Sequence, residues 1–183
     1  MTTSDHAVEE RRDPQADPAD VERADLLDTL AKHRRFLRYT VKELSDEQAA
    51  LRPTASGLCL GGLIKHVSRA EQGWADFIEH GPSSLGAADE AAMEAHGASF
   101  RMDGETLRGL LDSYEAVAER TDRLVRELPS LDASHPLPEA PWFAPGARWT
   151  ARRALLHIIA ETAQHAGHAD IIREAIDGQK TMG

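Results

Sequence analysis

The chain has 183 residues, which fits one domain or one domain with a tail. Its 31 acidic and 21 basic residues give a formal net charge of -10, which argues against nucleic acid as a partner because no basic surface is left to neutralise phosphates. The single cysteine, Cys59, excludes an internal disulfide and CxxC metal sites, and it fits a reducing, cytoplasmic setting. The polar N-terminus does not resemble a signal peptide, and no stretch approaches the roughly 18 apolar residues of a membrane helix, so no membrane association is expected.

The N-terminal part of the chain changes character near residue 20. Residues 1–18 are charged and lack periodicity, which predicts a disordered tail before a domain over 19–183. From Asp20 onward, apolar residues recur at helical spacing to about Leu44. The pattern predicts a first long helix with Asp20 as its N-cap.

The next segments predict a helical turn, a second long helix and a connection. Ser45 and Gln48 form a capping-box pattern, which predicts a short helical turn. The second long helix is predicted to begin at Ser56 and to stop at Gly81. The polar stretch over 81–102 predicts a long connection, and connections of this length are often binding loops.

Two further helices follow, and together the elements predict the fold class. Asp103 is the predicted cap of the third long helix, and the proline-rich residues 129–149 predict an extended crossover. Thr150 is predicted to cap the last helix and Gly178 to end it. No strand alternation is evident. Four amphipathic helices with two long connections predict an all-α four-helix bundle, in which long crossovers can make neighbouring helices parallel.

The last helix carries an unusual number of polar residues on its apolar side: His157, Glu161, His165 and His168. Glu161 and His165 are four residues apart, so they lie one turn apart on one face and can bind one metal ion together. A third ligand must come from a facing helix, and the second helix offers His66. Two histidines and a carboxylate form a known catalytic zinc set and suit other divalent metals. The alternative is a hydrogen-bonded polar network without a metal.

Neighbouring polar residues are candidates for supporting roles. His157 is predicted to orient a ligand, or to act as one in place of Glu161, and His168 to support a ligand or the pocket. Arg173 is either an exposed helix arginine or a partner for a substrate carboxylate. The histidines on polar faces or in connections are predicted to be solvated: His33, His80 and His96.

Two stretches of the chain resemble a known family. "SGLCLGGLIKHVSRAEQGW" and "WTARRALLHIIAETAQHAGHADIIRE" resemble the DinB-like superfamily, in particular the branch of small proteins related to the metal-binding domain of mycothiol-dependent maleylpyruvate isomerase. The shared pattern is a histidine in the second helix and an H/E-x-x-x-H motif in the fourth, followed by a Gly-His or Gly-Gln step. The resemblance covers about residues 20–180.

The resemblance implies a fold and a metal site. The implied fold is a bundle with its helices in up-down-down-up order, often assembled as a homodimer. The implied ligands of the divalent metal are His66, Glu161 and His165, with zinc as the first expectation and nickel, iron or manganese as alternatives. Many DinB-like proteins have histidine at the position of Glu161, whereas the isomerase branch has glutamate, as this chain does.

The resemblance also implies an activity. A low-molecular-weight thiol, with mycothiol as the expected co-substrate, would react as a metal-activated thiolate with an electrophilic substrate in an S-transferase or isomerase reaction. The isomerase has a second domain that helps build its active site, and this chain shows no counterpart, which counts against maleylpyruvate isomerisation itself. Two other classes stay open, namely a non-enzymatic metal-binding or stress-response protein and a bundle that acts as a dimerisation module.

Overall fold

The structure is a computed structural model that describes residues 17–86 and 89–181. Its elements in chain order are α1 (Pro18–Tyr39), α2 (Asp46–Ala50), α3 (Leu60–His80), the 3-10 helix η1 (Pro82–Leu85), α4 (Glu90–Ser99), α5 (Leu107–Glu127), β1 (Ser134–Pro136), β2 (Arg148–Thr150) and α6 (Ala151–Asp177). The predicted tail lies outside the described residues except for Asp17 and Pro18. Asp17 caps α1 through its carboxylate, and Pro18 is the first residue of that helix.

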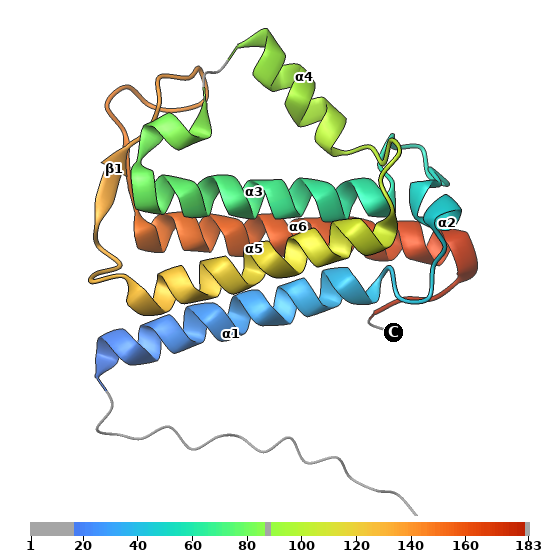
Figure 1. Ribbon diagram of the computed structural model, residues 1–183, viewed down its shortest axis with the longest axis horizontal. Helices are drawn as coiled ribbons and strands as arrows, with labels where there is room; N and C mark the ends of the chain where they lie inside the picture. Colours follow the sequence, from blue (N-terminus) through green and yellow to red (C-terminus); the bar gives the residue numbers. More distant parts are fainter. Residues whose placement is uncertain (1–16, 87–88, 182–183) are drawn as a thin grey trace, which may run out of the picture.

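The four long helices form the predicted bundle in up-down-down-up order (Figure 1). Helices α1 and α6 run in one direction, and α3 and α5 run in the other. The main packing contacts join α1 to α6 and α3 to both α5 and α6, while α1 and α5 meet much less closely. Two pairs of neighbours are therefore parallel, as the long crossover between α3 and α5 requires.

The predicted helix ends are partly right. Thr150 caps α6, Gly178 ends it with a left-handed backbone, and Ser45 and Gln48 form the capping box of α2. The caps predicted at Asp20, Ser56 and Asp103 are wrong by three residues each. The actual caps are Asp17, Cys59 and Thr106. Asp20 lies inside the first turn of α1, whereas Ser56 and Asp103 lie three residues before the side chains that cap α3 and α5.

The connection after α3 is more structured than the sequence predicts. It contains η1 and the ten-residue helix α4, which rises over α3 (Figure 1). Asp89 caps α4 by accepting a hydrogen bond from the backbone nitrogen of Ala92 at 2.9 Å. Residues 91–97 are all exposed, so α4 has no buried apolar stripe by which hydrophobic periodicity could reveal it.

A short antiparallel hairpin precedes α6, where the sequence predicts only an extended crossover. Strands β1 and β2 pair Ser134 with Thr150 and His135 with Trp149. Three-residue strands are too short to show alternation. Thr150 ends β2 and caps α6, so the hairpin fixes the position at which the last helix begins.

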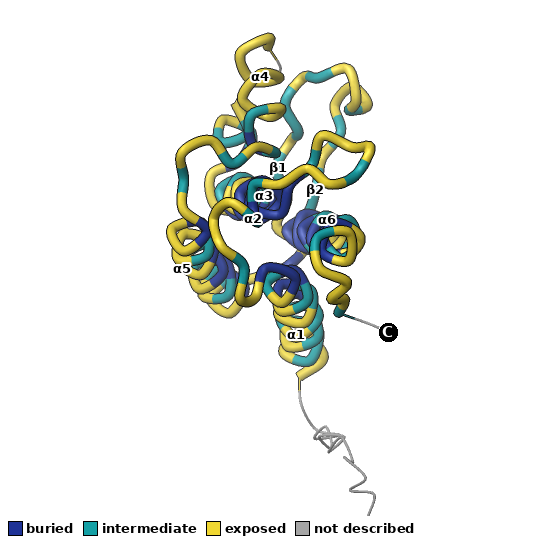
Figure 2. The backbone as a smooth tube through the Cα atoms, turned by 90° about the vertical axis from the view of Figure 1, so that its right-hand side faces the viewer, coloured by how far each residue is buried: buried dark blue, intermediate teal, exposed yellow. Residues whose placement is uncertain are grey.

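The interior contains two apolar clusters with a polar layer between them. One cluster includes Leu37 and lies toward α2, and the other includes Leu30 and lies toward the hairpin. Arg34, Glu71 and Thr162 fall between the two clusters along α1, α3 and α6. The buried residues of the four long helices lie on the sides that face one another in the bundle (Figure 2). Within residues 17–86 and 89–181, no helix is both long enough and apolar enough to cross a membrane.

Candidate metal centre and adjacent pocket

His66 on α3 meets Glu161 and His165 on α6, and we call these three residues the histidine cluster. The Oε2 atom of Glu161 lies 3.8 Å from Nε2 of His66 and 3.4 Å from Nε2 of His165. One ligand atom from each residue lies within 4.8 Å of the other two. Ligands bound at about 2.1 Å from one ion lie about 3–4 Å apart, so the most distant pair would have to approach by roughly 1–1.5 Å to hold a divalent metal.

The charges in the cluster favour a cation. Burial lowers the pKa of His66, so its imidazole is neutral near pH 7 and keeps a free electron pair on one nitrogen. The interaction with His165 holds the pKa of Glu161 well below its usual range, so its carboxylate is anionic. Electron-pair donors thus converge with one negative charge, and this donor set suits a divalent metal.

Ser99 fixes which nitrogen of His66 faces the cluster. The Ser99 hydroxyl donates to the carbonyl of His96 at 2.6 Å, and its oxygen lies 2.9 Å from Nδ1 of His66. Because the only hydroxyl proton is already donated, the oxygen of Ser99 accepts a hydrogen bond from Nδ1–H of His66. The free electron pair of His66 is therefore on Nε2, which faces Glu161.

Phe100 holds the imidazole of His66 in place from the side of α4. Its ring stacks on that of His66 with centroids 3.8 Å apart and planes inclined by 21°. The backbone at Phe100 can approach α3 this closely because Gly62 has no side chain. A Cβ at Gly62 would overlap the carbonyl oxygen of Phe100. Gly62 and Phe100 position His66 without providing a ligand atom.

The structure places His157 and His168 beside the cluster, on opposite sides. Nδ1 of His168 lies 3.4 Å from Nδ1 of His165, the nitrogen that faces away from Glu161. Nε2 of His157 lies 3.8 Å from Oε1 of Glu161. Both residues can orient a ligand, and burial lowers the pKa of His157.

Arg173 does not join this group. Its guanidinium donates to the backbone carbonyls of Thr40 and Lys42 and pairs with Asp177. These contacts hold the end of α1 to the end of α6, and the side chain is buried. The prediction of Arg173 as a partner for a substrate carboxylate is therefore corrected, because its donors are already occupied within the fold.

His96 is exposed, as the sequence predicts, yet it also lies beside the histidine cluster. Its ring is 5.2 Å from that of His66, and its carbonyl accepts the hydroxyl proton of Ser99. It also lines a pocket of about 580 Å³ between α3, α4 and residues 138–143, which we call the α4 pocket. Residues 81–102 and 129–149 both contribute to the wall of this pocket.

Comparison with known proteins identifies the family. A family model described as mycothiol-S-transferase matches residues 25–178. The chain belongs to the mycothiol-S-transferase family. The predicted resemblance to DinB-like proteins is thereby confirmed, and the family indicates mycothiol-related transfer chemistry. No curated protein matches the chain.

The fold of this mycothiol-S-transferase family member also occurs in a solved structure. The conserved protein of a locus from Enterococcus faecalis superposes with a TM-score of 0.64 at 16% sequence identity. The match covers 85% of this chain and 97% of that one. At this identity the likeness supports the all-α bundle alone.

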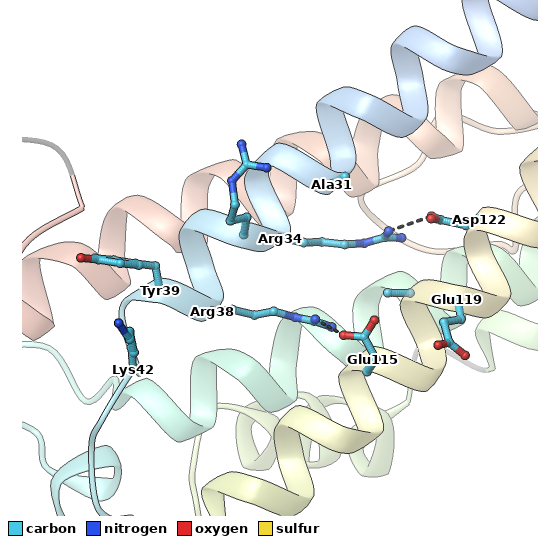
Figure 3. Close-up of a pocket in the computed structure, with 10 residues that line it drawn as sticks. Ala31, Arg34, Arg38, Tyr39, Lys42, Glu115, Glu119 and Asp122 are labelled. Carbon is cyan, nitrogen blue, oxygen red and sulfur yellow. Dashed lines mark hydrogen bonds and ion pairs between the residues drawn. The ribbon is translucent and has the colours of Figure 1, made fainter. Parts of the chain in front are cut away.

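A second polar cluster borders a pocket of about 470 Å³ between α1 and α5, whose lining residues are drawn in Figure 3. The guanidinium of Arg34 bonds Glu71 on α3 in a bidentate pair and bonds Asp122 on α5 at 2.7 Å. We call these three residues the ion-pair cluster. Beside it, Arg38 pairs with Glu115. Arg34 and Arg38 are thus each paired with carboxylates, which distinguishes this cluster from the histidine cluster.

Proposed function

We propose that this protein is a metal-dependent S-transferase that joins a low-molecular-weight thiol, mycothiol, to an electrophilic substrate at the histidine cluster. The observation that carries the proposal is the convergence of His66, Glu161 and His165 within 4.8 Å beside the α4 pocket. Membership in the mycothiol-S-transferase family supports the choice of thiol and of reaction.

His66, Glu161 and His165 would hold the metal, for which zinc is the first expectation and nickel, iron or manganese are alternatives. A bound divalent ion would supply positive charge that lowers the pKa of the thiol and stabilises its thiolate form. The three side chains leave a coordination position open for an exogenous ligand. Ser99 and His168 keep His66 and His165 oriented.

His157 is the residue best placed to accept the thiol proton. It lies on the side of the α4 pocket, with its ring 4.9 Å from that of Trp74, which lines the pocket. Because burial lowers its pKa, the imidazole is neutral near pH 7 and can act as a base. With an epoxide, the S–C bond forms while a C–O bond opens, and the epoxide oxygen takes up the proton. With a halide, the carbon–halogen bond breaks, and halide and proton are released.

The test begins with protein purified without a nickel column, whose metal is identified by element analysis. Consumption of mycothiol is then measured with a panel of epoxides, activated alkenes and halogenated compounds. His66→Ala and His165→Ala are expected to lose metal and activity, whereas the exposed His80→Ala should retain both. Absence of metal in the wild type, with no change in either variant, would overturn the metal site and favour a dimerisation module.

A second outcome separates an enzyme from a metal-binding protein. If the metal-loaded protein consumes no thiol with any electrophile, the transferase proposal fails and a non-enzymatic metal-binding or stress-response role replaces it. The proposal also includes a cytoplasmic homodimer. Light scattering coupled to gel filtration tests the oligomeric state, and a monomer would remove that part of the proposal.

A further inference from the structure

The α4 pocket has the composition of a site for an apolar ligand. Its volume of about 580 Å³ falls within the range of about 300–1,000 Å³ that is typical of small-molecule sites. Its lining includes Trp74, Met93, Trp142 and Phe143. Among the described residues that line it, none is a lysine, arginine, aspartate or glutamate, and the one titratable side chain is His96.

Two of these side chains are far more exposed than is usual for large apolar residues. Met93 on α4 is 66% exposed, and Trp142 in the segment after β1 is 63% exposed. They lie on two separate elements that rise on the same side of α3 (Figure 1), and both border the same pocket. Exposed apolar side chains that gather around a cavity, rather than scattering singly, indicate a surface that a ligand covers.

The α4 pocket borders the histidine cluster, because two of its lining side chains contact the cluster or its neighbour His157. His96 lines the pocket and lies 5.2 Å from the ring of His66. Trp74 also lines it and lies 4.9 Å from the ring of His157, whose Nε2 faces Glu161. A molecule in the pocket would therefore lie one side chain away from the histidine cluster.

We propose that the α4 pocket binds the apolar, uncharged part of the electrophilic substrate and so selects aryl or alkyl epoxides and halides over dicarboxylates. This inference rests on the proposed function for the reaction, but the binding specificity rests on the pocket itself. A carboxylate entering the pocket would meet no lysine or arginine among its described lining residues. The formal net charge of -10 would add unfavourable long-range electrostatics for an anion.

The binding test uses chelator-treated protein and N-phenyl-1-naphthylamine, an uncharged dye that becomes fluorescent in apolar surroundings. The dye is expected to bind the wild type. Met93→Glu and Trp142→Ala should weaken binding at least tenfold, because they place a charge in the wall or remove part of it. The matched control is Ile171→Glu on α6, since Ile171 is 63% exposed and does not line the pocket.

Equal dye binding by wild type and Met93→Glu would overturn the inference, even if transferase activity is found. Dye binding that Met93→Glu removes and Ile171→Glu preserves would support it, even if no thiol is consumed, so the two proposals can fail separately. Where activity is found, styrene oxide is expected to react with a kcat/KM at least tenfold above that of maleate. A preference for maleate would also overturn the inference.

Discussion

The ion-pair cluster and the histidine cluster put polar groups into the same bundle in opposite ways. In the ion-pair cluster, one cation meets two carboxylates at hydrogen-bond distance, with Nε of Arg34 3.1 Å from Glu71. In the histidine cluster, atoms that donate electron pairs face one another at 3.4–3.8 Å. The first arrangement satisfies its own charges, whereas the second leaves a negative charge and free electron pairs directed at one point.

Their positions in the bundle match this difference. The ion-pair cluster belongs to the layer between the two apolar clusters, where Arg34 and Glu71 are 5% and 1% exposed. The histidine cluster lies at the end of α4, where His96 contacts His66 on α3 and Phe100 contacts His165 on α6. We therefore expect the ion-pair cluster to determine folding stability and the histidine cluster to determine metal binding, and the following variants test that division.

The largest effect is expected for Glu71→Ala. It leaves the guanidinium of Arg34 buried without its bidentate partner, and breaking a buried pair in this way costs about 3–5 kcal/mol. Urea denaturation should show this loss in the presence of a chelator as well as in its absence. Glu79→Ala on the same helix breaks only a half-exposed pair with Arg120 and should cost at most about 1 kcal/mol. Equal losses in both variants would contradict the assigned role of the ion-pair cluster.

Gly62→Ala should affect both stability and metal binding. The new methyl group would overlap the carbonyl oxygen of Phe100, and overpacking of this kind costs about 2–3 kcal/mol. Displacing Phe100 also removes the ring that stacks on His66, so zinc should bind less tightly. Gly73→Ala on the same helix has room for its methyl group and should stabilise the fold by about 0.5–1 kcal/mol. A Gly62→Ala protein as stable as Gly73→Ala would show that this close approach is unimportant.

Ser99→Ala is expected to weaken zinc binding at least tenfold without changing the metal ligands. The variant removes the acceptor that keeps the proton of His66 on Nδ1, and loss of such a partner typically costs about 10–100-fold in metal affinity. Competition with a chromophoric chelator measures the affinity. Ser99→Thr retains the hydroxyl and should bind zinc nearly as the wild type does. Unchanged affinity in Ser99→Ala would exclude a role for the hydrogen bond in orienting His66.

The sequence predicts the bundle because each long helix buries an apolar stripe, and such stripes repeat along the chain. Helix α4 and the hairpin escape this reasoning for different reasons. Residues 91–97 of α4 are exposed, so the helix carries no periodic signal, and β1 and β2 are three residues long. The sequence does not decide which residue caps a helix where several serine, threonine or aspartate residues lie near its start.

The candidate site is predictable only as far as one helix extends. The spacing of Glu161 and His165 places them one turn apart, and the family resemblance contributes His66. Ser99 and His96 could not be found in this way. They reach His66 through the path of the chain after α3, which no local pattern specifies.

The smallest effect is a pH dependence that should be specific to the histidine cluster. Burial lowers the pKa of His66 below its ordinary value of 6.5, so near that pH the unfolded chain takes up a proton that the folded chain resists. The stability contributed by neutral His66 is therefore present above pH 6.5 and is lost as the pH falls through its lowered pKa. The Arg34–Glu71 bond raises the pKa of Arg34, although burial alone would lower it, so Arg34 does not titrate in this range.

Melting temperatures of metal-free protein between pH 7.5 and 5.5 should fall less in His66→Gln than in the wild type. His80→Gln, altered at an exposed position, should keep the wild-type slope, and a wild-type slope in His66→Gln would mean that the buried histidine does not couple folding to pH.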